Sequence, residues 1–378
     1  MEANKIILVG GDHYNGLALV RMFGEQGYTP YGIVVGHNSN QGFLIKSKYW
    51  KKTWCIESDD LIIQILKDNF SEEAVKPVII AYSDGATSIL DLNYNEISQH
   101  FILSSINSIE GKIYEMMDKG RQVEFAATCG LRMAKSHEIF LDKHHSVEDI
   151  SFPCIGKPIV SCEGDKKDIK KLTNQTELDC YLHELKEKGY ERILLQEFLS
   201  IDEEYDVEGY VDGDKCAYFC NEKIRTWPNV GGPTAYAFSI NDKALNCEIE
   251  KIVAVLKEIR YSGLFDVEIF KVNGEYYFNE INWRNSAVCF AAKQSGVNYP
   301  LYWFCSVTER EYEIDKAKKY PVYAMNELLD FQHVKTHEVS LWKWLSQIKR
   351  SEAKAYYDKD DLKPLIHRFV AFLKRKRL

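Results

Sequence analysis

Short apolar runs alternate with amphipathic stretches over the first hundred residues of the chain. Runs of strand length lie at residues 5–11 (KIILVGG), 29–35, 77–83 and 101–105, and stretches with helical spacing lie at 15–27, 58–70 and 85–97. Strands that alternate with helices build a parallel sheet with helices on its faces. We therefore predict a Rossmann-like α/β domain over residues 1–108.

The first predicted strand runs into the turn GGDHYNG at residues 10–16. This turn lacks the G-x-G-x-x-G pattern, and Leu17-Ala18 stands where a phosphate-binding loop has Lys and Ser or Thr. A dinucleotide-dependent oxidoreductase is therefore disfavoured. We interpret the turn as a tight strand-to-helix connection beside a ligand crevice, because ligands bind at the carboxyl ends of such strands. Whether it contacts a substrate stays open.

The middle of the chain favours antiparallel pairing. We expect helices and strands, in chain order, at 111–130, 152–160, 176–189, 192–199, 206–219, 244–261 and 263–283. Two of these stretches have a hairpin turn at their centre, Asp212-Gly213 and Asn273-Gly274. The pattern predicts an α+β domain over residues 109–310, divided near residue 195, with a mainly helical segment over 311–378.

Charge, cysteine content and hydropathy indicate which binding partners and which cellular compartment to expect. The 378 residues have a formal net charge of −8, which argues against nucleic acid. Ten cysteines without a CxxC pair are typical of reduced thiols in a cytoplasmic protein. No apolar run has the length of a membrane span, so no membrane partner is expected. The basic run Lys374–Arg377 is interpreted as a solvated helix end, with a binding tail as the alternative.

Residues 278–286 (FNEINWRNS) contain an acid, an amide and a base at alternate positions of a predicted strand. Side chains two residues apart point to one face, so Glu280, Asn282 and Arg284 are expected to project together. Two explanations are open at this point. The polar residues form a site, or they are solvent-facing groups on an edge hairpin.

Glu268 lies on the other strand of the same hairpin. It reaches the face of Glu280 only if the hairpin contains an odd loop or a bulge. A three-residue loop, Val272-Asn273-Gly274, would set Glu268 opposite Phe278; whether the hairpin has such a loop or a bulge is left open. Two carboxylates and an amide oxygen on one face suit Mg²⁺, which prefers a few protein oxygens with phosphate and water completing its shell.

Other polar residues occupy unexpected positions upstream. Lys157 lies at the centre of the apolar stretch FPCIGKPIV, where a half-buried ammonium needs an anionic partner. Gln196-Glu197-Phe198-Leu199 ends a strand with acceptors and an apolar segment, which suits an adenine. Glu204 suits ribose hydroxyls, and Lys119 lies in a helical segment that leads toward Lys157. Each also has an ordinary surface interpretation.

The order of these residues resembles the ATP-grasp superfamily over about residues 110–300. The resemblance rests on Asp118-Lys119, Lys157-Pro158, Gln196 to Leu199, Glu204, Glu268 and the stretch Glu280-Ile-Asn282-x-Arg284. It implies an N-terminal α/β domain followed by an α+β ATP-grasp domain. Within the superfamily the chain looks nearest to carboxylate–amine ligases of the D-aspartate-ligase-like and amino-acid ligase group.

The resemblance also implies roles for single residues. Lys119 and Lys157 would hold the α- and β-phosphates of ATP, Gln196 to Leu199 the adenine and Glu204 the ribose. Glu268, Glu280 and Asn282 would bind one or two Mg²⁺ ions, with Mn²⁺ as a substitute. Arg284 would stabilise the transferred phosphoryl group or the acyl phosphate.

Two stretches depart from the family pattern. Trp283 replaces a proline found in many relatives and is expected to line the substrate pocket. The loop 160–168 has one glycine where many relatives are glycine-rich, so Lys166 or Lys167 would replace some backbone contacts to phosphate. Arg225, before Gly231-Gly232, is expected to clamp carboxylates together with Arg284.

The sequence thus predicts an ATP-dependent ligase that joins a small-molecule carboxylate to an amine, with the loops 160–168 and 226–234 as candidate lids. The alternatives are a bicarbonate-using carboxylase-like enzyme and a nucleotide-binding regulator without catalysis. The sequence identifies neither substrate nor the pathway. A homodimer is compatible with it.

Overall fold

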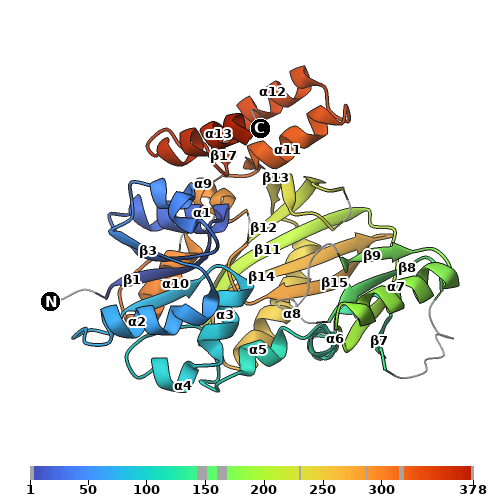
Figure 1. Ribbon diagram of the computed structural model, residues 1–378, viewed down its shortest axis with the longest axis horizontal. Coiled ribbons are helices and arrows are strands. Elements are labelled where there is room, and N and C mark those ends of the chain that lie inside the picture. Colours follow the sequence, from blue (N-terminus) through green and yellow to red (C-terminus); the bar gives the residue numbers. More distant parts are fainter. Residues whose placement is uncertain are drawn as a thin grey trace.

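The computed structural model describes residues 4–142, 151–159, 168–229, 231–286, 288–314 and 319–375, with side chains up to residue 371. Figure 1 shows a parallel sheet near the N-terminus, a small antiparallel sheet beside α7, and a long sheet that runs through the middle of the molecule. Among the described helices, none combines the length and the apolar character that crossing a bilayer requires.

The N-terminal sheet is parallel, with strand order β3-β2-β1-β4. Its elements are β1 (Ile6–Gly11), α1 (Tyr14–Gly24), β2 (Tyr31–Val35), η1 (Ser39–Gln41), η2 (Leu44–Lys46), β3 (Lys52–Ile56), η3 (Asp59–Leu61), α2 (Ile62–Phe70), β4 (Val78–Ala81), α3 (Asp84–Asp91) and α4 (Tyr94–Ile97). The strand β1 is central and almost fully buried, as expected for a parallel strand with helices on both faces.

Three details of this region differ from the sequence prediction. The strand β3 was missed because its residues KTWCI are mostly exposed or half-buried and lack an apolar run. The predicted strand 101–105 is wrong: Ile102 makes a single bridge to Val78, and β5 (Ser105–Ile106) pairs with the large sheet. The predicted helix 85–97 is two helices, α3 and α4.

The small sheet is antiparallel, with strand order β7-β10-β8-β9. The elements of this region are α5 (Lys112–Met116), α6 (Lys119–Thr128), β7 (Ser136–Phe140), β8 (Cys154–Pro158), β9 (Lys170–Leu172), α7 (Gln175–Glu187) and β10 (Arg192–Glu197). The predicted helix 111–130 is interrupted because the Asp118 side chain caps a new helix, α6, by accepting from the backbone N–H groups of Gly120 and Arg121.

The large sheet has the order β17-β16-β13-β12-β11-β14-β15-β6, with β5 paired to β14. Its elements are β6 (Arg132–Met133), β11 (Glu203–Asp212), β12 (Lys215–Thr226), β13 (Thr234–Ile240), α8 (Lys243–Glu258), β14 (Tyr261–Val272), β15 (Glu275–Asn282), β16 (Tyr323–Met325) and β17 (Ala353–Lys354). Apolar residues of its central strands alternate with polar ones and pack against α8. One face is therefore core, and the other is free to be polar.

The remaining helices belong to the C-terminal part of the chain, and some of them pack against the N-terminal part. They are α9 (Cys289–Ser295), α10 (Tyr299–Val307), α11 (Glu327–Lys335), α12 (Leu341–Arg350) and α13 (Lys363–Arg375). One buried core joins α1 to α9 and α10. Arg21 of α1 lies 3.1 Å from the Asp361 carboxylate in the segment before α13. Because these contacts cross both expected boundaries, the division at residues 108 and 310 stays a prediction.

Candidate active site

Acidic residues line the polar face of the large sheet where its central strands lie side by side. Glu204, Asp206 and Glu208 alternate along β11, and Asp266 and Glu268 alternate along β14. The register sets Asp206 opposite Glu268 and Glu208 opposite Asp266. Buried carboxylates in such numbers require cations or hydrogen-bond donors nearby. This face is therefore the place to look for bound cations.

The hairpin β14–β15 sets Glu268 directly opposite Glu280. Its turn contains two residues, Asn273 and Gly274, which have φ values of 51° and 81°. Of the two alternatives left open by the sequence, the three-residue loop with Glu268 opposite Phe278 is therefore not the one formed. An Asn-Gly pair with both residues left-handed forms the hairpin turn that matches the twist of its strands.

A bulge, and not the loop, brings the two carboxylates to one face. The register shifts between Glu268 and Ile269, which pair with Glu280 and Phe278, so Asn279 is the extra residue. The Asn279 side chain donates to Glu268 Oε2 at 2.9 Å. One inserted residue reverses the side to which all following residues point. The geometric requirement of the predicted metal site is met in this way.

Lys157 connects the small sheet to this face. It lies on β8, is 7% exposed, and its Nζ donates to Gln196 Oε1 on β10 at 3.0 Å. Burial and the charge of Lys119 lower the pKa of Lys157 to about 8, and the carboxylates of Glu280 and Glu268 oppose that shift. The two lysines and the two acids therefore interact electrostatically, although they come from separate parts of the chain.

Lys119 is the first residue of α6. Its backbone N–H donates to Ile159 O at 2.8 Å, which fixes α6 against the end of β8. The N–H groups of Gly120 and Arg121 in the same turn donate to the Asp118 carboxylate. The N–H groups of this turn thus have partners already, and an anion here would be attracted by the Lys119 ammonium group.

The predicted adenine segment follows β10. Glu197 is held by Lys135, because its Oε1 accepts from the Lys135 N–H at 2.9 Å and its own N–H donates to Lys135 O. The Phe198 ring lies 3.7 Å from Lys171 Nζ, and Leu199 is half-buried. The Glu197 carboxylate and the N–H groups of Glu197 and Phe198 thus have partners already, and the adenine role of this segment stays a prediction.

Lys223 of β12 is a residue that the sequence analysis missed. Its Nζ lies 2.5, 3.0 and 3.0 Å from carboxylate oxygens of Glu204, Asp206 and Glu268. The side chain is 4% exposed. Burial raises the pKa of Glu204 while the charge of Lys223 opposes that rise. The predicted ribose acceptor Glu204 is thus engaged by an internal cation.

Asp266 and Glu208 form a deeper acidic pair. Asp266 Oδ2 accepts from Asn282 at 3.2 Å, and Glu208 accepts from Tyr299 at 3.0 Å and from Asn221 at 3.3 Å. Burial holds both carboxyl pKa values well above the ordinary range, with the charge of Asp266 adding to the rise at Glu208 and the charge of Asp206 adding to the rise at Asp266. These groups continue the polar face past the predicted metal ligands.

Arg284 connects the hairpin to the N-terminal sheet. Its Nε and Nη2 donate to the two carboxylate oxygens of Asp84, at 2.7 and 3.2 Å. Asp84 is the first residue of α3. The charges of Asp84, Asp266 and Glu280 stabilise the Arg284 guanidinium and raise its pKa. Arg284 therefore lies beside the predicted metal ligands, as the alternation indicated.

Arg225 is not brought to the same place. It donates to both Asp330 oxygens at 2.8 and 2.9 Å and to Gln347 at 2.9 Å, so it ties β12 to α11 and α12. The sequence could not foresee this pairing, because Asp330 lies 105 residues further along the chain. The predicted joint clamp of Arg225 and Arg284 is absent from this arrangement.

Trp283 does not line the polar face. It is 2% exposed, packs with Phe125 and Tyr261, and donates through Nε1 to Met116 O. It belongs to the core on the side of α8. The expectation that it lines a substrate pocket is wrong, because alternation sends residue 283 to the face opposite Asn282.

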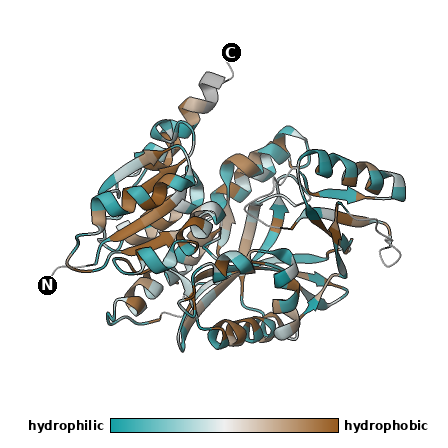
Figure 2. Cartoon of the chain, turned by 60° about the horizontal axis from the view of Figure 1, so that its bottom comes forward, coloured by the Kyte–Doolittle hydropathy of each residue, from teal (hydrophilic) through white to brown (hydrophobic). Residues whose placement is uncertain are grey.

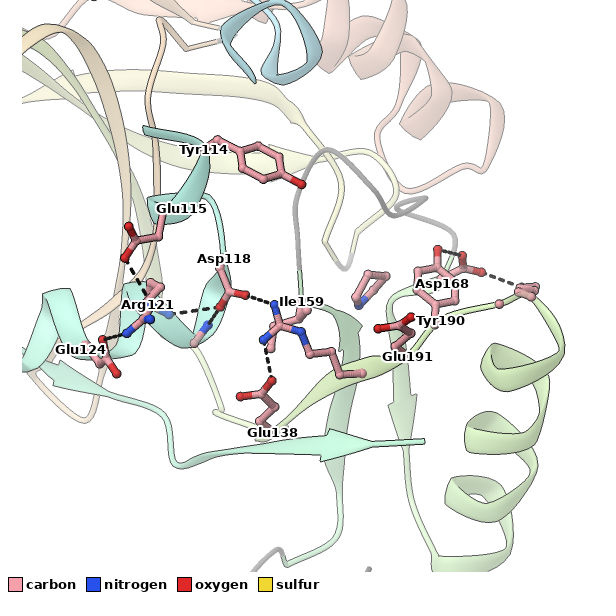
Figure 3. A pocket seen from close by; sticks show the side chains of 15 residues that line it. Tyr114, Glu115, Asp118, Arg121, Glu124, Glu138, Ile159, Asp168, Tyr190 and Glu191 are labelled. Atoms are coloured by element: carbon pink, nitrogen blue, oxygen red, sulfur yellow. Dashed lines mark hydrogen bonds and ion pairs between the residues drawn. The ribbon is translucent and has the colours of Figure 1, made fainter. Parts of the chain in front are cut away.

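A cavity of about 1030 Å³ lies beside the N-terminus of α6 (Figure 3). Arg192, one of the residues that line the cavity, forms ion pairs with Asp118 and Glu138 at 2.6 and 2.7 Å. Its lining includes Ile159 and Asp168, the two ends of the segment 160–167. That segment, with the predicted phosphate contacts of Lys166 and Lys167, lies outside the described residues. The lining does not include Glu268 or Glu280.

The chain resembles two curated proteins over part of its length. No family model matches the chain. It is 25% identical over 265 residues to D-aspartate ligase of Enterococcus faecium, covering 63% of this chain but 60% of that protein. It is 23% identical over 298 residues to a formate-dependent phosphoribosylglycinamide formyltransferase of Vibrio cholerae, covering 68% of this chain and 72% of the relative.

Solved structures share the fold more completely. The N5-carboxyaminoimidazole synthetase of Staphylococcus aureus with bound ADP has a TM-score of 0.66 at 15% identity, covering 89% of this chain and 86% of that one. The L-amino acid ligase of Bacillus licheniformis has a TM-score of 0.57 at 14% identity, covering 79% and 73%.

These similarities support the predicted resemblance to the ATP-grasp superfamily.

The donor set on the polar face of the large sheet fits a nucleotide-bound Mg²⁺. Among the described residues, no three His, Cys, Asp or Glu side chains are arranged to hold a metal ion by themselves. Two carboxylates, Glu268 and Glu280, together with the Asn282 amide supply hard oxygens, and Asn282 is oriented by its bond to Asp266. Mg²⁺ commonly takes one or two carboxylates and completes its shell with phosphate oxygens and water.

Some further residues on the polar face of the large sheet could have been predicted from the sequence pattern. In the β12 stretch CAYFCNEKIRT, Lys223 interrupts an otherwise half-apolar strand, as Lys157 does in β8. Asp206 and Asp266 alternate with Glu204 and Glu268 and so share their face. Asp84, in contrast, carries no such signal, because only the fold brings α3 beside β15.

Proposed function

We propose that this protein is an ATP-dependent ligase that joins the carboxylate of one small molecule to the amine of another, releasing ADP and phosphate. The observation that carries the proposal is the pairing of Glu268 with Glu280 beside the bulge. The charges of both acids, and that of Lys119, act on Lys157. Two cations and two acids in this arrangement suit a triphosphate with its metal ion.

The residues of the small sheet would hold the nucleotide. Lys119 and Lys157 would neutralise the phosphates, while Gln196 keeps the Lys157 ammonium in position. The segment Gln196 to Leu199 would bind the adenine. Glu204 would accept from ribose hydroxyls after releasing Lys223, which it binds in this arrangement.

The hairpin residues would hold the reacting groups. Glu268, Glu280 and Asn282 would bind Mg²⁺, and Arg284 would lie against the developing negative charge of the phosphoryl group. Bound MgATP would supply the phosphoryl group that turns the substrate carboxylate into an acyl phosphate. Lys223, which Asp206 and Glu268 would still hold, adds a further positive charge at the same place. Exclusion of water by the loops 160–168 and 226–234 would protect the acyl phosphate from hydrolysis.

Unpaired acceptors beyond the metal ligands support an amino-acid substrate. The Oδ1 atoms of Asn221, Asp266 and Asn285 are buried and have no hydrogen-bond partner among the described residues. A substrate ammonium group would supply donors and a positive charge opposite Glu208 and Asp266. The names of two similar proteins, D-aspartate ligase and L-amino acid ligase, point to the same class of substrate.

An ADP-release assay with Mg²⁺ and a panel of carboxylates and amino acids tests the proposal. We expect turnover only when a carboxylate and an amine are both present, and none in the Glu280→Gln variant with unchanged circular dichroism. Turnover with bicarbonate as the only carboxylate source would favour the carboxylase-like alternative. Tight ATP binding without turnover under any condition would favour a regulator.

A further inference from the structure

The C-terminal helix α12 presents an apolar surface to solvent. Leu341, Trp342 and Leu345 are 47%, 81% and 42% exposed. They are grouped on one side of the helix by their spacing. The other side is anchored, because Trp344 packs edge-on against Phe331 with ring centroids 5.2 Å apart. The exposed side is therefore a fixed feature of a packed helix.

The helix α13 repeats this arrangement. Ile366, Phe369 and Val370 are 56%, 56% and 42% exposed, and Leu362 extends the same stripe by one turn at 42%. The opposite side is anchored where Arg368 lies over the Phe43 ring, 5.5 Å from its centroid. Figure 1 shows α11, α12 and α13 together as one layer, and the hydropathy colours of Figure 2 show both hydrophilic and hydrophobic residues along the helix that leads to the C-terminus.

The charge of these helices is opposite to that of the whole protein. Neither α12 nor α13 contains an acidic residue, whereas α12 contains Lys343, Lys349 and Arg350 and α13 contains Lys363, Arg368, Lys374 and Arg375. The chain as a whole has a formal net charge of −8. Exposed aromatic and aliphatic residues combined with basic residues are typical of helices that lie in the interface of an anionic membrane.

We propose that α12 and α13 bind the protein peripherally to an anionic lipid surface. The apolar residues, with Trp342 and Phe369 at their centre, enter the boundary between headgroups and acyl chains, and Lys343, Lys349 and Lys363 contact lipid phosphates. Arg350 and Arg368 instead lie over the rings of Tyr323 and Phe43. A second copy of the chain fits this face less well, because a symmetric contact would set basic helices against each other. The proposal replaces the sequence expectation of no membrane partner, and it does not depend on the proposed ligase activity.

Co-sedimentation of the full-length protein with vesicles tests the proposal. We expect binding to vesicles of phosphatidylcholine with phosphatidylglycerol, little binding to pure phosphatidylcholine, and release as salt rises. The double variant Trp342→Glu with Phe369→Glu should lose at least about tenfold in vesicle affinity. Lys343→Gln with Lys349→Gln should lose roughly fivefold per lysine. Ile109→Glu, which changes a residue 49% exposed outside these helices, should bind like the wild type.

Three outcomes would overturn the proposal. The first is no binding to anionic vesicles at low salt, and the second is equal binding by the wild type and the Trp342/Phe369 double variant. The third is a wild-type dimer that this double variant converts to a monomer, measured by light scattering, without vesicle binding. That result would make the face an interface between copies. ADP release in solution, measured on the same variants, separates this question from the ligase proposal.

Discussion

Two buried lysines, Lys157 and Lys223, define the electrostatics of the site in opposite ways. Lys223 lies within 3.0 Å of three carboxylate oxygens, and their charges hold its pKa well above the ordinary value despite burial. Among the described residues, Lys157 is hydrogen-bonded to the amide of Gln196, and burial lowers its pKa although the charges of Glu280 and Glu268 oppose that shift. A nucleotide phosphate would add a further negative charge beside Lys157.

The pKa of about 8 predicts a pH dependence for nucleotide binding. Below pH 8 Lys157 is charged and attracts phosphate; as pH rises through 8 the charge is lost and the affinity for ADP should fall. Titration calorimetry between pH 7 and 9 should show that loss in the wild type. In Lys157→Arg the fall should vanish, since arginine stays charged. An identical pH profile in both proteins would contradict the prediction.

The same shift has a consequence for stability without nucleotide. Because the folded pKa lies below the ordinary 10.5, the unfolded chain binds more protons between about pH 8 and 10.5. This residue alone therefore makes the fold more stable as pH rises through that range. The charged form is the one that opposes folding.

Removal of the Lys223 ammonium should destabilise the fold. In Lys223→Met the carboxylates of Glu204, Asp206 and Glu268 would face each other without a cation, and we expect a loss of about 3 kcal/mol in the free energy of unfolding. Urea denaturation measures this loss. Adding Asp206→Asn should recover part of it, and a double variant as unstable as the single one would argue against repulsion as the cause.

At the scale of elements, the hairpin β14–β15 depends on one inserted residue. Alternation in the sequence correctly predicted that Glu280 and Asn282 share a face, and the Asn-Gly turn was recognisable. The position of the bulge was not recognisable, because nothing in the sequence marks Asn279 as the residue that is left unpaired. Alternation also implies that Trp283 faces the core, but its place in the family motif suggested a substrate contact.

Deletion of Asn279 should abolish Mg²⁺-dependent nucleotide binding. Without the bulge, Glu280 and Asn282 would turn toward the α8 core and apolar residues would replace them on the polar face. Asn279→Ala, which keeps the bulge and loses only the bond to Glu268, should bind within about tenfold of the wild type. ADP titration with and without Mg²⁺ compares the two. Normal Mg²⁺-dependent binding after the deletion would show that the bulge is not required for the metal site.

At the scale of the whole molecule, contacts distant in sequence join the two ends of the chain. Arg284 of the hairpin binds Asp84 beside the N-terminal sheet, and Arg21 binds Asp361 near the C-terminus. The local pattern predicted the sheets and most of their helices. It could not predict these pairs, nor that of Arg225 with Asp330, because each depends on elements between 105 and 340 residues apart.

The Asp361 carboxylate should be a major support of this arrangement. It is buried and accepts from Arg21 Nε, Ser47 Oγ and the Lys48 N–H, at 3.1, 2.7 and 3.0 Å. Asp361→Ala leaves the Arg21 guanidinium buried without its partner, so we expect a loss of about 3–5 kcal/mol in the free energy of unfolding. Glu248→Ala, which breaks an exposed pair with Lys251, should cost less than about 1 kcal/mol. Equal losses of unfolding free energy in the two variants would contradict a major stabilising role for Asp361.

The central claim is that Glu268 and Glu280 jointly hold the metal ion of a bound nucleotide. Calorimetric titration of ADP, with and without Mg²⁺, into the wild type, Glu268→Gln, Glu280→Gln and the double variant tests it most directly. If both residues bind one ion, the double variant should lose little more affinity than either single variant, a departure from additivity of about 1 kcal/mol or more. Fully additive losses, or ADP binding that does not depend on Mg²⁺ in the wild type, would contradict the claim.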